Sequence, residues 1–183
     1  MRIYFDTSER PYAELTSHFA FRVFGLSGDA AVAFVGPCRV DNKDLVDWAD
    51  RRAGDHIAAA RMLHFIIEHF GIGLREAVWR QRLLTSIAVD ALAAAKPDVP
   101  FRREGDDIYV GDGKLTVSIA TVSPVSALIH LGINIDGAGA PVKTADLNGL
   151  DVEPEPLARI LLERYAAEVA SVEEAICKVR GIC

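Results

Sequence analysis

The hydrophobic pattern of the first seventy residues predicts a buried strand followed by a buried helix. Residues 29–35 (DAAVAFV) form a nearly continuous apolar run, which is typical of a strand buried on both faces, and a glycine–proline pair follows it. Cys38 is therefore expected just past the end of this strand. Between about residues 55 and 70 the apolar positions recur at helical spacing until Gly71 interrupts them. We predict a mostly buried helix over that stretch.

Two more helices are predicted from the same spacing. Residues 74–95 keep the helical period until Pro97 stops it. Residues 153–156 (EPEP) have the acidic side chains and prolines that a first helical turn prefers, and an apolar stripe runs from Leu157 to Val169. A further helical stretch is expected to continue to about Val179. The chain is therefore expected to end in a long amphipathic helix.

Between these two helices the hydrophobic period changes from 3.6 to 2, which predicts a pair of half-buried strands. Apolar and polar residues alternate over residues 114–120 and again over residues 127–136. Because the connection between the two stretches is short, an antiparallel hairpin is the simplest arrangement.

The length of the hairpin loop decides which side chains share a face. A three-residue loop centred on Pro124 would place Ser118 opposite His130. The same register would set Lys114 opposite Asn134, so the polar residues of both strands would lie on one face. An even-numbered loop would turn the two polar rows toward opposite faces.

Length, composition and charge restrict the class of protein. The 183 residues, half of them apolar, suit a single domain over residues 1–183. No apolar run approaches the roughly twenty residues of a membrane span, and the amino terminus lacks the pattern of a signal peptide. The net charge of -6, with scattered basic residues, disfavours a nucleic acid as partner. We expect a cytoplasmic protein that binds neither a membrane nor a nucleic acid.

Cysteines and histidines do not suggest a metal centre. The three cysteines are an odd number without a Cys-x-x-Cys pair, which argues against a disulfide framework or structural zinc. His64 and Glu68 would share a face of the predicted helix, but His69 would lie about 100° away from Glu68. We therefore expect no metal site.

The order of residues in the central part of the chain follows the pattern of a known superfamily. A predicted helix is followed by VPFRREGDDI at residues 99–108, by GKL at residues 113–115, by Ser118, and by HLGINI at residues 130–135. Over roughly residues 83 to 137 this succession resembles the core of biotin and lipoate protein ligases and of octanoyl transferases. In that superfamily an Asn-Asp-Ile strand, a Gly-x-Lys strand and a returning Gly-Ile-Asn strand follow one another, and the lysine lies against the ligand.

The resemblance implies an α+β fold of the biotin/lipoate protein ligase type, which is class II synthetase-like and has a mixed, mainly antiparallel sheet flanked by helices. It also implies a cleft over the polar face of the hairpin for a small carboxylate-type ligand. There Lys114 would be catalytic, because a positioned cation stabilises the negative charge of acyl transfer or adenylate formation. The ligand-binding candidates are Asp106, Asp107, Ser118, His130, Gly132, Asn134 and Cys38.

Two functions remain open. The ligases imply ATP with magnesium as cofactor, but the sequence lacks the Arg-Arg-x-x-Gly-Gly or Gly-Arg-Gly-Arg segment with which they enclose an acyl-adenylate. Octanoyl transferases use a lysine and a cysteine, and Cys38 is the candidate for the latter. The chain is either an acyl-transfer or carboxylate-activating enzyme, or a non-catalytic small-molecule-binding or interaction module that has lost the nucleotide loop.

The whole chain also resembles a small, mainly archaeal family of unknown function, through residues 28–38 (GDAAVAFVGPC) and 64–70 (HFIIEHF). That family adds no activity to the interpretation. An exposed edge strand would make a homodimer a further expectation.

Several candidate residues also have an ordinary structural explanation. Asp106 and Asp107 suit a hairpin turn, and His130 suits a hydrogen-bonded position in a core. Asp47 and Asp50 are further candidates for a binding loop, although acids in loops are commonly just solvated.

Overall fold

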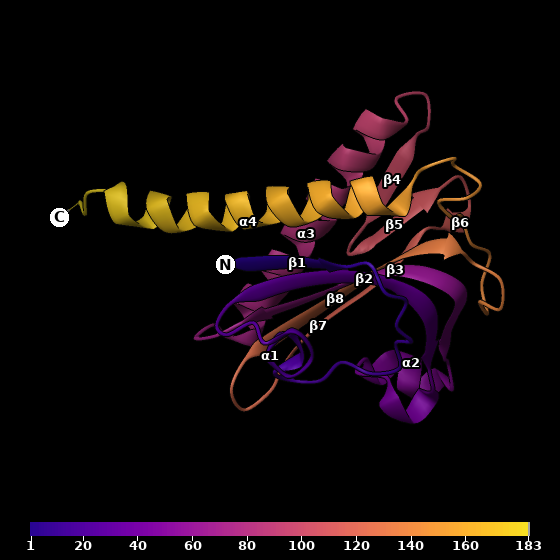
Figure 1. Ribbon diagram of the computed structural model, residues 1–183, viewed down its shortest axis with the longest axis horizontal. Coiled ribbons are helices and arrows are strands. Elements are labelled where there is room, and N and C mark those ends of the chain that lie inside the picture. The colour runs from indigo at the N-terminus through magenta and orange to yellow at the C-terminus, as the bar shows by residue number, and fades with distance from the viewer. Residues whose placement is uncertain (183) are drawn as a thin grey trace.

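Two sheets organise the chain, and the computed structural model describes residues 1–182 of it (Figure 1). The larger sheet has five strands in the order β1-β2-β3-β8-β7, and the smaller has three in the order β4-β5-β6. Within these residues β1 and β2 run parallel, and the other neighbouring strands run antiparallel. The strands are β1 (Arg2–Asp6), β2 (Ala30–Val40), β3 (Ile57–His69), β4 (Phe101–Glu104), β5 (Asp107–Val110), β6 (Gly113–Lys114), β7 (Thr116–Val122) and β8 (Ala127–Asp136). The helices are α1 (Phe19–Phe24), the 3-10 helix η1 (Asn42–Asp44), α2 (Trp48–Ala53), α3 (Leu74–Ala95) and α4 (Pro154–Lys178).

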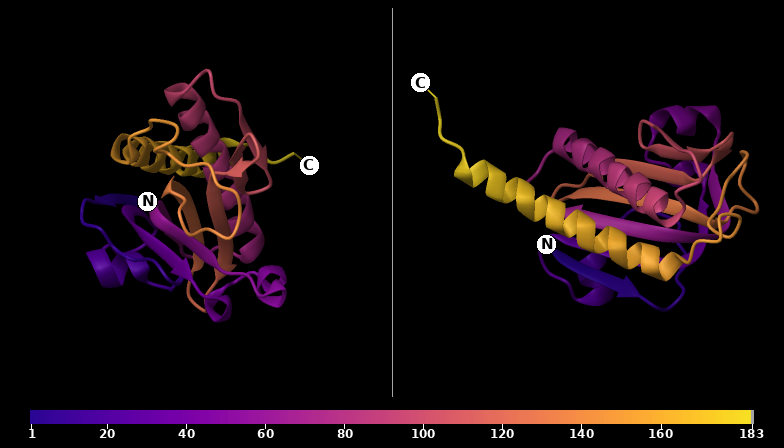
Figure 2. Two further views of the ribbon diagram at one scale, coloured as in Figure 1. Left: turned by 90° about the vertical axis from the view of Figure 1, so that its right-hand side faces the viewer. Right: turned by 90° about the horizontal axis from the view of Figure 1, so that it is seen from above.

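The larger sheet separates two hydrophobic clusters. The long helices α3 and α4 pack on one face, and α1 packs on the other (Figures 1 and 2). Alternate residues of the central strand β3 enter the two clusters: Leu63 and Phe65 pack on the side of α3 and α4, whereas Met62 and Ile66 pack on the opposite side. The architecture is α+β, as the sequence predicts.

The predicted helix over residues 55–70 is wrong, because this stretch forms β3. A strand in the middle of a sheet with a core on each side needs apolar residues at successive positions, so it shows no period of 2. Here Leu63 and Phe65 fill one core while Met62 and Ile66 fill the other, and their spacing coincides with that of a helix. The local pattern therefore predicts the burial of this segment correctly and its conformation wrongly.

The polar residues of β3 connect the strand to its surroundings. His69 Nε2 lies 2.9 Å from the hydroxyl of Tyr165 in α4, and the Glu68 carboxylate accepts a hydrogen bond of 2.6 Å from the Ser126 hydroxyl. In a strand His64 and His69 point to opposite faces. Among residues 1–182 no group of three or more His, Cys, Asp or Glu side chains is arranged to hold a metal ion.

Cys38 lies inside a strand, which corrects the expectation that the chain turns before it. The strand β2 continues through the glycine–proline pair to Val40, with a change of register between Gly36 and Cys38. Proline has no N–H to donate, so it fits at such an irregularity. The carbonyl of Pro37 instead accepts a hydrogen bond of 2.9 Å from the backbone N–H of Tyr12.

The predicted hairpin exists as β7 and β8, but its expected register is wrong. Ser118 pairs with Leu131, and His130 pairs with Ile119, because a four-residue turn at residues 123–126 joins the strands. The two polar rows therefore face opposite sides of the sheet. The helices at 74–95 and from 154 onward lie where the sequence predicts them.

The second half of α4 extends beyond the rest of the molecule (Figure 1). From Ala170 onward its described residues are exposed. None of the helices within residues 1–182 has the length and apolar composition that a membrane crossing requires.

Candidate functional site

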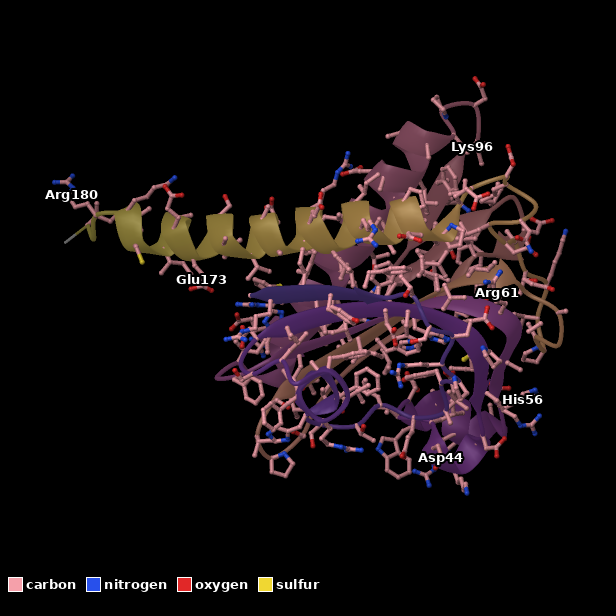
Figure 3. All side chains as sticks on the ribbon, in the orientation of Figure 1. Asp44, His56, Arg61, Lys96, Glu173 and Arg180 are labelled. Carbon is pink, nitrogen blue, oxygen red and sulfur yellow. The ribbon has the colours of Figure 1, made fainter. Side chains whose placement is uncertain are left out.

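A groove follows the edge of β7, between this strand, the small sheet and the segment that contains η1 and α2. Its outer pocket has a volume of about 380 Å³ and adjoins an inner pocket of about 90 Å³. Both are lined by Leu45, Asp47, Asp50, Ile57, Asp106 and Ser118. The outer pocket adds Asp55, His56, Ala58, Met62, Asp107, Lys114, Val117, Asn134, Ala140, Pro141, Val142 and Thr144, and the inner pocket adds Tyr12, Glu14, Leu15, Val40, Asp44, Val46, Ile119 and His130. Figure 3 marks the α2 side of the groove by Asp44 and His56.

Lys114 lies in the wall of the outer pocket and is held from two sides. Its Nζ lies 2.8 Å from Asp107 Oδ2, and its side chain is 29% exposed. Its backbone N–H donates to the carbonyl of Lys143 (3.0 Å), and its own carbonyl accepts from Asn134 Nδ2 (3.1 Å). Burial raises the pKa of Asp107, and the hydrogen bond and charge of Lys114 partly offset that rise. The ammonium is therefore positioned at a cavity wall.

Gln81 of α3 connects the small sheet to β7. Its Nε2 donates to Asp106 Oδ2 (2.6 Å) and to Ser118 Oγ (2.9 Å), and Arg82 pairs with Asp106 at 3.2 Å. Ser118 Oγ in turn donates to the backbone carbonyl of His130 (2.9 Å). Gln81 is not among the residues predicted from the sequence, where its signal is a polar residue on the apolar face of a predicted helix. Asp106 and Ser118 are thus fixed by hydrogen bonds within the protein.

His130 lines the inner pocket and belongs to a stack of buried rings. Its Nε2 lies 3.1 Å from His64 Nδ1, and His64 Nε2 lies 3.3 Å from the carbonyl oxygen of Gly36. The ring of Tyr12 stacks on that of His130 with 4.1 Å between the ring centroids. Burial lowers the pKa of both imidazoles, for His64 to about 4, so both are neutral near pH 7. No spacing along the chain indicates that Tyr12, His64 and His130 would meet, because the three residues are far apart in the sequence.

For three other candidate residues, hydrogen bonding, packing or burial explains the residue type. Asn134 lines the outer pocket, but its amide donates to the carbonyls of Lys114 and Ala145 and so holds the loop to the sheet. A Cβ at Gly132 would collide with the side chain of Met62, which explains the glycine by packing alone. Cys38 lies outside the groove in a hydrophobic cluster, where burial raises its pKa to about 12. The part played by Cys38 toward a ligand stays a prediction, since its buried side chain lines neither pocket of the groove.

Carboxylates dominate the lining of the groove. The outer pocket has one lysine but five aspartates, namely Asp47, Asp50, Asp55, Asp106 and Asp107. The pKa of Asp50 is raised by burial and then by the charges of Asp47 and Asp55, and the charge of Lys114 acts against this rise. In the sequence Asp47 and Asp50 are candidates for a binding loop, but nothing there indicates that they line the same pocket as Lys114. The groove therefore favours cations, or anions that enter with a divalent cation.

A larger hollow of about 500 Å³ lies between β1 and the start of α4, and none of the predicted site residues line it. Two of its carboxylates already have arginine partners: Asp6 pairs with Arg10, and Glu9 pairs with Arg61 at 2.8 Å. The groove, in contrast, contains six of the eight candidates from the sequence. We therefore take the groove as the candidate functional site.

Comparison with known proteins identifies the family. A family model described as "Domain of unknown function (DUF366)" matches residues 1–180. The protein belongs to this family. An uncharacterized protein from Methanocaldococcus jannaschii is 34% identical over 172 residues, which cover 90% of this chain and 77% of the relative. A solved structure, a protein of unknown function from Pyrococcus horikoshi, has a TM-score of 0.93 at 34% identity. The match covers 100% of this chain and 99% of the Pyrococcus chain.

Solved ligases share the fold of this DUF366 chain. A mutant biotin protein ligase from Aquifex aeolicus in complex with biotin has a TM-score of 0.62 at 13% identity, over 95% of this chain and 72% of the ligase. A lipoate-protein ligase A bound with ATP has a TM-score of 0.55 at 13% identity, over 93% of this chain and 86% of the ligase. The predicted biotin/lipoate protein ligase-like fold is confirmed. At such low identity the likeness concerns the fold alone.

Proposed function

We propose that the groove binds a small carboxylic acid or its activated form, and that the protein is an acyl-transfer or carboxylate-activating enzyme. The observation that supports this most is the Lys114 ammonium in the wall of the outer pocket, in a chain with the fold of biotin and lipoate ligases. A positioned cation in a partly enclosed site can stabilise developing negative charge on an acyl group by several kcal/mol. Lys114 would supply that cation.

In this proposal Asp106 and Asp107 have a different task from Lys114. Five aspartates in the outer pocket would repel a free nucleotide, so ATP would enter with magnesium. Carboxylate oxygens are suitable magnesium ligands, and Asp106 and Asp107 line the same pocket as Lys114. Magnesium, when bound, would neutralise phosphate charge. The ligand carboxylate would replace Asp107 as the partner of Lys114.

The alternative is a small-molecule-binding module without catalysis. One observation favours it: among the described residues, no arginine lines either pocket. Arg51 and Arg52 lie at the end of α2, outside the lining of the groove. Such a module would bind its ligand by the same residues and release no product.

Pyrophosphate release from ATP and magnesium, with a panel of small carboxylic acids, separates the two functions. We expect one acid to support release and Lys114→Ala to lower kcat/KM by about 100-fold or more. Lys96→Ala is the matched control, because that lysine is also 29% exposed and also paired with an aspartate, Asp151 at 3.2 Å, but lies outside the groove. Thermal stabilisation by a carboxylate without pyrophosphate release would instead support the binding module. The absence of both stabilisation and release would exclude both proposals.

A further inference from the structure

Two buried side chains present unpaired polar atoms to the inner pocket. Tyr12 and His130 line it and are only 6% and 3% exposed. Neither Tyr12 Oη nor His130 Nδ1 has a hydrogen-bond partner within residues 1–182. Every fully inaccessible side-chain nitrogen or oxygen in this part of the chain does have a partner. These two atoms are therefore accessible, and the residues that carry them both line the inner pocket.

The hydrogen-bond chain fixes the tautomer of His130. His64 Nε2 faces the carbonyl of Gly36 at 3.3 Å, so this nitrogen carries the hydrogen and donates it. His64 Nδ1 is then an acceptor, and His130 Nε2, at 3.1 Å, must donate to it. Since burial keeps His130 neutral, its Nδ1 has a free lone pair. His130, which lines the inner pocket, thus has an unpaired hydrogen-bond acceptor.

The charged side chains that line the inner pocket are all carboxylates. Five carboxylates line it and, among the described residues, no lysine or arginine does. They are Glu14, Asp44, Asp47, Asp50 and Asp106. Burial, and then the charges of Asp47 and Asp55, raise the pKa of Asp50, so a bound cation would relieve an unfavourable arrangement. The volume of about 90 Å³ holds roughly three water molecules, which is the size of an ammonium group with one or two carbons.

We propose that the inner pocket binds the ammonium group of a small primary amine, with an N–H of the amine donated to His130 Nδ1 and its charge facing Asp47 and Asp50. Apolar side chains of Leu45 and Ile119 would contact its carbons. This inference rests on the proposed function for the acyl ligand in the outer pocket, and it makes the amine the second ligand of the same groove. Binding of the amine by itself needs neither an acyl ligand nor turnover.

Titration of the isotope-labelled protein with ethylammonium chloride, followed by amide chemical shifts, tests the proposal. We expect saturable shifts around Tyr12 and Asp50, and no comparable binding of ethanol, which has similar size without the charge. Asp50→Asn should weaken binding about 10-fold, because it removes one exposed carboxylate that faces the ligand. Asp98→Asn, an exposed aspartate outside both pockets, should leave the affinity unchanged.

Tyr12→Phe provides a second variant that retains the buried ring. It removes only the hydroxyl and should weaken ethylammonium binding several-fold. Absence of ethylammonium binding, equal binding of ethanol, or an affinity that neither Asp50→Asn nor Tyr12→Phe changes would overturn the proposal. A failure to bind the amine would not contradict Lys114-dependent pyrophosphate release, which is measured separately. Conversely, amine binding without any pyrophosphate release would remove only the carboxylate-activating function.

Discussion

His64 and His130 show how single residues shape both the core and the groove. Both sit on central strands where apolar residues would pack as well, yet each imidazole nitrogen that faces protein has a partner. A neutral imidazole can donate with one nitrogen and accept with the other, so two of them can form a chain without a buried charge. This chain leaves one acceptor, His130 Nδ1, for the inner pocket.

Neutral buried histidines make stability depend on pH. The pKa of His64 falls from its ordinary value of 6.5 to about 4 in the folded protein, because burial disfavours its charged form. Below pH 6.5 the unfolded chain therefore binds more protons than the folded protein, and acid favours unfolding. From pH 7.5 to pH 5 we expect the free energy of unfolding to fall by about 2 kcal/mol from this residue, as measured by urea denaturation.

A variant comparison assigns this pH effect to the buried ring. The exposed His56 offers the control, since His56→Gln should keep the full decrease. His64→Asn should reduce the decrease, although it lowers stability at both pH values. An unfolding free energy that does not change between pH 7.5 and pH 5 would show that the rings are not held neutral.

At the scale of the element, close approach of the chain to β2 places Tyr12 over His130. Backbone hydrogen bonds of 2.9 Å join Arg10 to Val35 and Tyr12 to Pro37. This approach requires glycine at position 36, because a Cβ there would collide with the backbone of Arg10. Gly36 therefore determines where Tyr12 lies.

Substitution of Gly36 should expose this dependence. We expect Gly36→Ala to lower the free energy of unfolding by at least about 1 to 3 kcal/mol, since backbone must move to admit the methyl group. Gly181→Ala, where nothing lies within 4 Å of the added atom and the residue is exposed outside any helix, should change it by less than about 0.5 kcal/mol. Equal effects of the two substitutions, in parallel denaturation curves, would contradict the packing described for residues 10–12.

Sequence alone predicted the elements whose pattern is local. The helix α3 and the carboxyl-terminal helix α4 present one apolar face, and β8 alternates, so their periods appear in the sequence. The strand β3 was missed because its two buried faces come from the arrangement of the whole sheet. The hairpin register was missed because it depends on the loop length at residues 123–126, which the alternation leaves open.

Only the part of the candidate site whose residues lie near one another in the sequence was predicted. Asp106, Asp107 and Lys114 lie close together in sequence and line the same pocket. Tyr12 and Asp50 come from segments that only the tertiary fold brings to β7, so no spacing along the chain could indicate them. The excess of carboxylates around the groove likewise appears only in three dimensions.

At the scale of the whole molecule, the central claim is that the groove along β7 is where small ligands bind. It competes with the larger hollow beside β1, which contains Asp6 and Arg61. Chemical-shift mapping of the labelled protein with hexanoate and magnesium decides between them. The account predicts that the shifted amides cluster around Lys114, Asp107 and β7; shifts confined to the hollow beside β1, or none at either place, would contradict it.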